Sequence, residues 1–275
     1  MSKTNLDSDG FRTVISKRSN KNKQTKIPRD FSSLANQDTP IDINKVVRRI
    51  QSAVEELQAS SYLENVFKSV STHIKSREVV ELVCFGLGHI GECQISWYQT
   101  ALLLCLKEHF KATKTLVHDP IFSKSECDVL KQLGLEIIKE NQEGSYIISD
   151  QDVSLMYFPH CPKQLTNNFL WSNWTEKLQN CVLLCNSFTA IIDNNPSRVL
   201  NETVPFIDKI YLYTLETKLE NSFRFTDIFN DTSVHSFPTE NLEKVAESFW
   251  EKTKKPVYEN TEEFITSCMI EKLNI

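Results

Sequence analysis

The residues best suited to chemistry are three glycines, Gly86, Gly88 and Gly91, within the stretch VVELVCFGLGHIG. Their spacing is G-x-G-x-x-G. They follow an apolar, β-branched run at 79–85 and precede an apolar, proline-free stretch at 95–110. A glycine turn between a strand and a helix lets backbone N–H groups approach an anion at the helix N-terminus. The pattern fits a turn that binds a nucleotide-type ligand, NAD or S-adenosylmethionine. It equally fits a turn whose glycines allow close helix–strand packing.

Polar residues also follow the other predicted strands. Asp119 ends the run 114–119, where it is placed either to bind the ribose of a nucleotide or to begin a turn with Pro120. His160 and Cys161 come after a run at 154–158. Because parallel strands deliver their carboxyl ends to one edge of a sheet, we predict a binding site at that edge. Its predicted residues, none with a catalytic or metal-binding role, are Gly86, Gly88, Gly91, Asp119, His160, Cys161 and Asn186.

The sequence His160–Cys161–Pro162 has three interpretations. A cysteine nucleophile would need the histidine folded toward the thiol, whereas adjacent side chains usually point apart. A Cys-Pro thiolate can also serve as an axial ligand of haem iron. In the third interpretation, Pro159 and Pro162 stiffen a loop in which His160 and Cys161 make local hydrogen bonds.

Two further stretches have unusual polar content. Residues 167–174 combine two tryptophans with three asparagines, a set that fits a planar ligand or a partner, or else a core with a polar edge. Residues 225–237 read FTDIFNDTSVHSF. Their polar side chains fit either metal ligands or the turn-forming chemistry of Asn and Asp; those side chains are Asp227, Asn230, Asp231 and His235.

Short apolar strands alternate with helices along the chain. A helical pattern from Ile43 to Ile74 breaks near Ser60. Ser123 and Glu126 form a capping-box pattern before a helix that stops at Gly134. The predicted strands are 79–85, 114–119, 135–139, 154–158, 181–185 and 209–214, and further helices are predicted at 95–110, 162–174 and 240–252. Apolar strands without a polar face indicate an α/β fold: a Rossmann-like, doubly wound, mostly parallel sheet with flanking helices.

The charge distribution separates a tail from a body. The 275-residue chain has a net charge of −5, yet residues 1–30 hold eight basic and three acidic side chains, and the remainder holds 23 basic and 33 acidic ones. We predict that residues 1–40 form a basic, disordered tail and that 41–275 form one domain. An acidic body argues against a nucleic-acid platform and leaves at most weak contact through the tail.

The distribution of apolar residues along the chain also bears on its cellular location. The chain lacks an apolar run near the roughly 20 residues that span a membrane, and it begins without the apolar segment of a secretory signal. We therefore expect the cytoplasm or the nucleus and no membrane association. Most of the eight cysteines lie in apolar patterns, which indicates buried, reduced thiols.

Several motifs together resemble the SRR-like (sensitivity to red light reduced) family over residues 79–238. They are CFGLGHIG, VHDP, YFPHCPKQLTNNFLWSNW, LLCNSF and FNDTSVHSFP. The resemblance implies a regulator of circadian clock input, clock-gene expression and haem biosynthesis that acts through protein partners, without an agreed catalytic residue. It also draws attention to Asn168, Trp171 and His235. The hypotheses are thus a non-enzymatic regulator with a small-ligand-sensing pocket, an enzyme with a nucleotide-type cofactor, and a haem sensor.

Overall fold

The structure is a computed structural model that describes residues 41–258. The predicted basic tail, residues 1–40, lies outside the described residues, as do residues 259–275. The described chain begins with α1 (Ile43–Gln58) and α2 (Ser61–Ile74). Asp42 accepts a hydrogen bond from Lys45 N at 3.0 Å, and Ser60 accepts one from Leu63 N at 3.3 Å. These caps begin the two helices, and the predicted break at Ser60 is confirmed.

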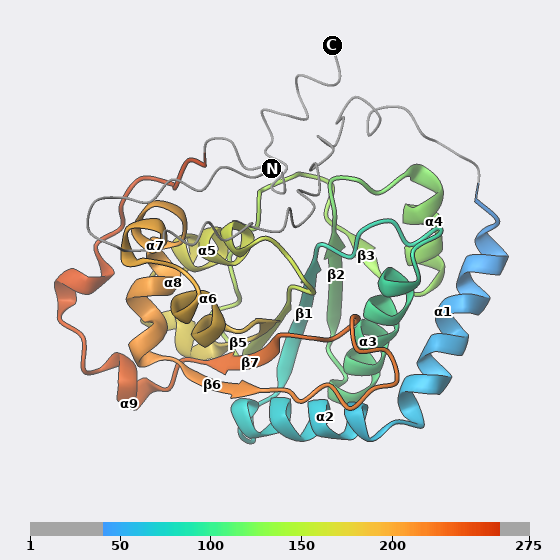
Figure 1. The fold of residues 1–275 in the computed structure, drawn as a ribbon, viewed down its shortest axis with the longest axis horizontal. Coiled ribbons are helices and arrows are strands. Elements are labelled where there is room, and N and C mark those ends of the chain that lie inside the picture. The colour runs from blue at the N-terminus through green and yellow to red at the C-terminus, as the bar shows by residue number, and fades with distance from the viewer. Residues whose placement is uncertain (1–40, 259–275) are drawn as a thin grey trace, which may run out of the picture.

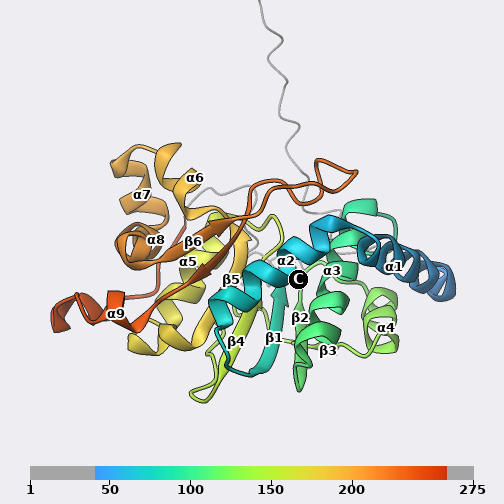
Figure 2. The same ribbon diagram turned by 90° about the horizontal axis from the view of Figure 1, so that it is seen from below.

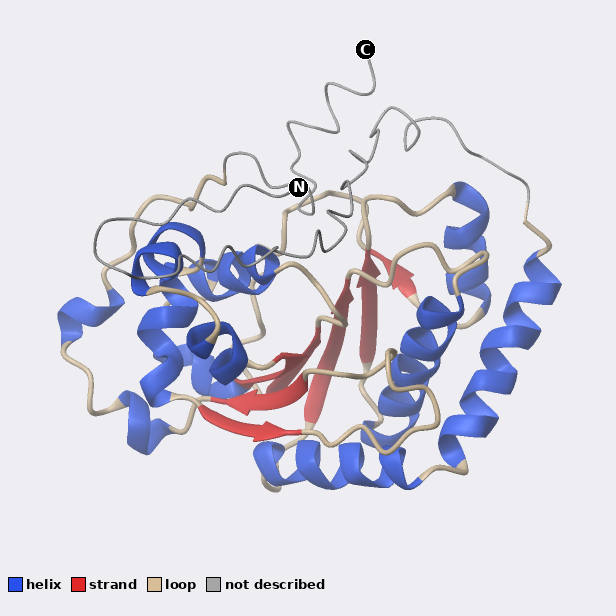
Figure 3. Ribbon diagram, in the orientation of Figure 1, coloured by secondary structure: helices blue, strands red, loops and turns tan. Residues whose placement is uncertain are grey.

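Strands and helices then mostly alternate, as Figures 1 and 3 show. In chain order they are β1 (Val79–Phe85), α3 (Gln94–Phe110), β2 (Lys114–His118), α4 (Lys124–Gln132), β3 (Glu136–Ile137), β4 (Val153–Tyr157), α5 (Lys163–Ser172), β5 (Cys181–Asn186), α6 (Phe188–Asp193), α7 (Ser197–Thr203), α8 (Pro205–Ile210), β6 (Leu215–Lys218), β7 (Thr232–Ser236) and α9 (Thr239–Leu242). Short 3-10 turns occupy Glu176–Asn180, Tyr211–Tyr213 and Glu247–Trp250.

The described strands form one seven-stranded sheet of order β3-β2-β1-β4-β5-β7-β6. Its first five strands are parallel, β7 runs antiparallel to β5, and β6 runs antiparallel to β7. The order 3-2-1-4-5 is that of the doubly wound nucleotide-binding folds, in which the chain reverses its direction of winding between β1 and β4. The predicted Rossmann-like α/β fold is confirmed.

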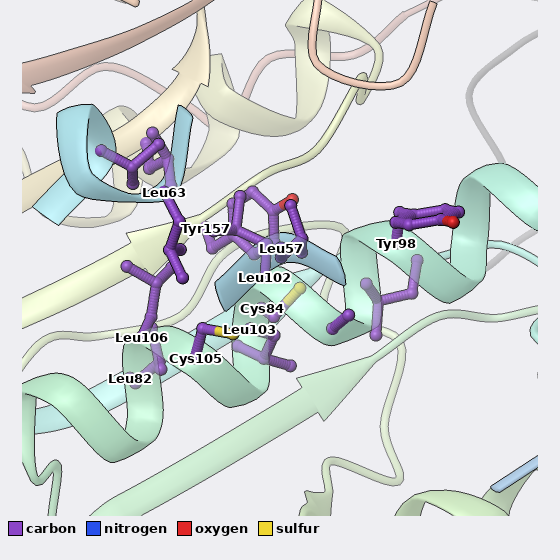
Figure 4. Close-up of a cluster of buried hydrophobic side chains, with 14 of the residues drawn as sticks. Leu57, Leu63, Leu82, Cys84, Tyr98, Leu102, Leu103, Cys105, Leu106 and Tyr157 are labelled. Atoms are coloured by element: carbon purple, nitrogen blue, oxygen red, sulfur yellow. The ribbon is translucent and has the colours of Figure 1, made fainter. Parts of the chain in front are cut away.

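Alternate residues of β1 feed two cores. Leu82 and Cys84 pack with α1 to α4 on one face of the sheet, whereas Val83 and Phe85 pack with α5, α7 and α8 on the other. Figure 2 shows these two helix layers on either side of the sheet, and Figure 4 shows the first core between β1, α2 and α3. Because both faces are covered, the central strands are mostly apolar, with Glu81 of β1 and Ser154 of β4 as buried polar exceptions.

Two predicted elements are wrong. Residues 209–214 are not a strand: Pro205 starts α8, whose Phe206, Ile207 and Ile210 are buried at helical spacing, and the edge strand begins only at Leu215. The helix predicted at 240–252 is reduced to α9 and one 3-10 turn. Conversely, β7 went unpredicted because its residues are mostly polar, although all five are buried.

Two further properties follow from these elements. The seven cysteines within 41–258 are free thiols, and five of them are buried. Across that part of the chain, the helices are too short or too polar to cross a membrane.

Candidate functional site

The carboxyl ends of four adjacent parallel strands bring the predicted site residues together. Gly86 N donates to the carbonyl of His118 at 3.0 Å, which ties the ends of β1 and β2. Asn186, the last residue of β5, donates from Nδ2 to the carbonyl of Cys161 at 3.1 Å, which ties β5 to the loop after β4. The edge therefore has the position expected of a ligand site in this fold.

Asp119 closes the glycine turn from the neighbouring strand. Its Oδ2 accepts a hydrogen bond from Gly88 N at 2.8 Å, and its Oδ1 accepts one from Ile121 N at 3.1 Å. Burial raises the pKa of Asp119, against these two hydrogen bonds. The Asp119 carboxylate thus accepts the hydrogen bond of a backbone N–H that a bound phosphate would otherwise accept. It also begins the turn toward Ile121.

Glu126 closes the same turn further along. Its Oε1 accepts from Gly91 N at 3.0 Å, and its Oε2 accepts from Ser123 N at 2.9 Å. Ser123 Oγ in turn accepts from Glu126 N, so the predicted capping box of α4 is confirmed. The sequence pattern identified Glu126 as a helix cap and gave no sign that it binds the glycine turn. A buried carboxylate on Gly91 is therefore the site feature that sequence reasoning missed.

His89 lies beside this carboxylate, with Nδ1 3.3 Å from Glu126 Oε2. The hydrogen bond to Glu126 raises the pKa of His89. Although burial acts in the opposite sense, the hydrogen bonds from His89, Ser123 and Gly91 lower the pKa of Glu126 overall. The carboxylates of Asp119 and Glu126 thus bind the glycine turn, and the imidazole of His89 lies beside Glu126.

The variant Glu126→Gln tests this arrangement. Its amide group presents a donor where Ser123 N and His89 require an acceptor, so we expect the free energy of unfolding to fall by about 1–3 kcal/mol. We also expect the pKa of His89 to move down toward its ordinary value, as measured by NMR titration. Glu108→Gln, at an exposed position of α3, is the matched control. An unchanged His89 titration in Glu126→Gln would contradict the assignment.

Cys161 fills the space beside Gly86. Its Sγ, 6% exposed as a residue, donates to the carbonyl of Phe85 at 3.1 Å. A Cβ on Gly86 would overlap this sulfur. Burial, and then the charge of Asp119, raise the pKa of the thiol well above its ordinary value. A neutral, buried thiol favours the interpretation of Cys161 as a local hydrogen-bond donor over a nucleophile or a haem ligand.

His160 lies on the exposed side of the same loop and has a left-handed backbone, with φ of 49°. Its ring interacts with the backbone of Ile228, and within residues 41–258 it makes no hydrogen bond to Cys161. The structure therefore places His160 and Cys161 in one loop without pairing their side chains.

The other polar stretch, 225–237, divides between a turn and the core. Asp231 has a φ of 51° and lies in the turn before β7. His235 is fully buried in β7, with Nδ1 3.5 Å from Cys185 Sγ and Nε2 3.5 Å from Glu216 Oε1. Among the residues that the structure describes, His, Cys, Asp and Glu side chains do not gather in threes that could hold a metal.

Three surface cavities lie away from the glycine turn. A cavity of about 370 Å³ lies between α1 and α3, one of about 420 Å³ beside α6 and β6, and one of about 400 Å³ between α2 and β6. The seven predicted binding residues line none of these three.

Comparison with known proteins now bears on this geometry. The family model described as the SRR1 domain matches residues 50–236, which include the glycine turn, the loop of Cys161 and the sheet through β7. The chain belongs to the SRR1 domain family. The SRR-like resemblance is thereby confirmed, and the match also takes in most of α1 and all of α2.

Relatives in the SRR1 family come from animals and a plant. An SRR1-like protein of Drosophila melanogaster is 29% identical over 230 residues, covering 82% of this chain and 80% of that protein. One of Mus musculus is 32% identical over 186 residues, covering 66% and 74%. The protein Sensitivity to Red Light Reduced 1 of Arabidopsis thaliana is 22% identical over 166 residues, covering 55% and 60%.

A solved structure gives a weaker likeness. The crystal structure described as MtNAS in complex with MTA and tNA has a TM-score of 0.38 and 12% identity, and the alignment covers 76% of this chain and 85% of that chain. A likeness at this level carries no inference about function.

Proposed function

We propose that this SRR1-domain chain is a non-enzymatic regulator that acts through protein partners. The plant relative is named for sensitivity to red light, and we extend that kind of role to this chain. Circadian clock input and the regulation of haem biosynthesis, which the family resemblance implies, are the processes that we propose it serves, in the cytoplasm or the nucleus. The observation that supports a regulator is the state of the glycine turn.

The backbone N–H groups of Gly88 and Gly91 already have hydrogen-bond acceptors within the protein. A pyrophosphate approaching Gly88 and Gly91 would meet the carboxylates of Asp119 and Glu126, which already accept the hydrogen bonds of those two amides. It would have to replace both and overcome repulsion between like charges. Cys161 leaves no space beside Gly86. These contacts disfavour a permanently bound nucleotide cofactor and support a turn that stabilises the sheet edge.

One observation favours the alternative, an enzyme that uses NAD or S-adenosylmethionine. The helix α3 begins after Cys93 without a side-chain cap, and the next two residues, Gln94 and Ile95, are exposed. The first N–H groups of α3 therefore offer an anion site of the type used by nucleotide-binding folds. In this alternative the seven predicted residues bind the ligand, and Asp119 moves from Gly88 to the ribose.

A ligand panel separates the two proposals. We expect the melting temperature of the full chain to stay constant with NAD(H), NADP(H) and S-adenosylmethionine, and we expect added haem to keep the Soret band of free haem. A ligand present at 100 times its dissociation constant would add about 2.7 kcal/mol. That corresponds to roughly 5–10 °C for a chain of this size. A rise that Asp119→Asn abolishes would overturn the regulator in favour of the enzyme.

A further inference from the structure

The asparagine- and tryptophan-rich helix α5 contacts a later segment of the chain, residues 251–258. We call residues 251–258 the strap. We call Asn167, Asn168 and Trp171 of α5, together with Glu143 of the loop that Asn168 bonds, the α5 face. The indole N–H of Trp171 donates to the carbonyl of Thr253 at 2.9 Å. Nearby, the indole N–H of Trp174 donates to the carbonyl of Phe249 at 2.7 Å. The indole of Trp171 thus holds the main chain of the extended strap, and that of Trp174 holds the 3-10 turn just before it.

Side chains of the strap contact the α5 face at every third residue. The ammonium of Lys252 lies 4.7 Å from the centre of the Trp171 ring, and that of Lys255 lies 2.7 Å from Glu143 Oε2. The hydroxyl of Tyr258 completes the series. A period of three in a segment without helix or strand, and with Pro256 inside it, is typical of polyproline II conformation. Lys-x-x-Lys-x-x-Tyr is therefore the pattern that this face binds.

The contact at Tyr258 is specific for a hydroxyl group. Asn167 Nδ2 donates to the tyrosine oxygen at 2.8 Å, and the same oxygen donates to Asn168 Oδ1 at 2.9 Å. Both asparagines are fully buried. Burial also raises the pKa of Tyr258, so the hydroxyl keeps its proton. Phenylalanine offers neither bond, and a phosphorylated tyrosine would bring about two negative charges near Glu143.

The strap itself is held weakly compared with the core. Each of its eight residues is exposed or half-buried, and Val257 is 83% exposed. Its attachment therefore depends on polar and cation–π contacts rather than on buried apolar area, so it can open without unfolding the sheet.

We propose that the α5 face is a docking surface for extended segments of the pattern Lys-x-x-Lys-x-x-Tyr. The strap is its intramolecular occupant, and a partner segment of the same pattern replaces it. The inference rests on the proposed function, because it supplies a surface through which a regulator engages a protein partner. It uses one recognition mode throughout: the Trp171 indole N–H on the main chain, and three side-chain contacts at polyproline spacing.

The test uses the full chain carrying Lys252→Ala, Lys255→Ala and Tyr258→Phe, which we call the disarmed chain. The probe is a fluorescent peptide with the sequence of residues 250–258, WEKTKKPVY, and binding is followed by anisotropy. We expect one peptide to bind per disarmed chain. Binding to the wild type should be at least about tenfold weaker, because the tethered strap competes at high effective concentration. Peptides with phenylalanine or phosphotyrosine at the last position should bind about tenfold or more weakly than the tyrosine peptide.

Two variants of the disarmed chain locate the bound peptide. Trp171→Phe keeps an aromatic ring but removes the donor to the main chain, so it should weaken binding several-fold. Trp97→Phe removes an indole that donates to Ile90 O, on the opposite face of the sheet, and should leave binding unchanged. Circular dichroism and the melting temperature confirm the fold of each variant. If the triple variant fails to fold, Tyr258→Phe alone replaces it.

Three outcomes would overturn this docking surface. One is binding to the disarmed chain no tighter than that of a scrambled peptide, and another is equal binding to the wild type and the disarmed chain. The third is a wild-type dimer that the disarmed chain lacks, which would assign the α5 face to a second copy rather than to a partner. A cofactor response in the ligand panel would overturn the proposed function while leaving the peptide result intact, so the two failures are distinguishable.

Discussion

Gly86→Ala is expected to lower the free energy of unfolding by about 2–4 kcal/mol, from backbone strain and steric overlap together. Gly86 has a φ of +80°, a conformation that alanine adopts only with strain, and the added Cβ would overlap the sulfur of Cys161. That thiol is buried and bonded to the carbonyl of Phe85, so it has little freedom to withdraw. Urea denaturation measures the loss.

Gly134→Ala is the matched control. Its φ of +73° carries similar backbone strain, but the atom nearest to the new Cβ is Lys107 Nζ at 3.0 Å, the far end of a flexible side chain that donates to Gly134 O. We expect a loss of about 1 kcal/mol there, because the strain remains and the steric conflict is relieved. The difference between the two glycines therefore measures the overlap with Cys161.

A double-mutant cycle identifies the partner. Cys161→Ala removes the sulfur that the new Cβ would meet, so Gly86→Ala should cost at least about 1 kcal/mol less in that background than in the wild type. Additivity of the two changes to within about 0.5 kcal/mol would show that Cys161 is not the obstacle. Coupling would establish that the sheet edge between β1 and β4, where ligands sit in related folds, is filled by a thiol of this chain.

Much of this arrangement could be predicted from the sequence, because the signals are local. Apolar runs that end at Gly86, at Pro120 and at Pro159 predicted β1, β2 and β4, since a buried parallel strand needs apolar residues on both faces. Once the strands are parallel, the residues after them lie at one edge. The gathering of Asp119 and Cys161 there followed without any knowledge of their contacts.

The contacts themselves depend on residues far apart in the chain. Asp119 bonds Gly88 across 31 residues, and Glu126 bonds Gly91 across 35. A glycine pattern shows that an anion can approach the turn, but it does not show which anion does. The contacts of the strap were unpredictable for the same reason, since Asn167 bonds Tyr258 across 91 residues. The polar strand β7 escaped prediction because distant elements bury its side chains: His73 of α2 contacts Ser236, and Phe188 of α6 contacts His235.

His73 shows what such long-range burial does to stability. Its Nδ1 lies 2.8 Å from Ser236 Oγ on β7, and its Nε2 lies 2.8 Å from Thr217 Oγ1 on β6. Burial, with a smaller contribution from nearby His235, lowers the pKa of His73 to about 4. The ordinary value for histidine is about 6.5. The folded state therefore favours a neutral imidazole that bridges two hydroxyl groups.

We expect the free energy of unfolding to fall as the pH drops from 6.5 to 4. In this interval the unfolded chain binds a proton at His73 that the folded chain does not, so stability is fully present above pH 6.5 and the loss stops below pH 4. The contribution is about 2–3 kcal/mol. Glu216 acts in a lower range, because contact with His235, acting against burial, lowers the pKa of its carboxyl group below the ordinary value.

The variant His73→Gln isolates this contribution, since its amide cannot titrate and retains hydrogen-bonding atoms toward Ser236 and Thr217. Urea denaturation at several pH values should show a shallower loss between pH 6.5 and 4 than in the wild type. Burial also lowers the pKa of His109, at an exposed position of α3, so His109→Gln should remove a part of the slope that is smaller than that removed by His73→Gln. If the His73→Gln chain lost stability between pH 6.5 and 4 as steeply as the wild type, another group would be taking up the proton. His73 of α2 would then not be the source of the acid sensitivity.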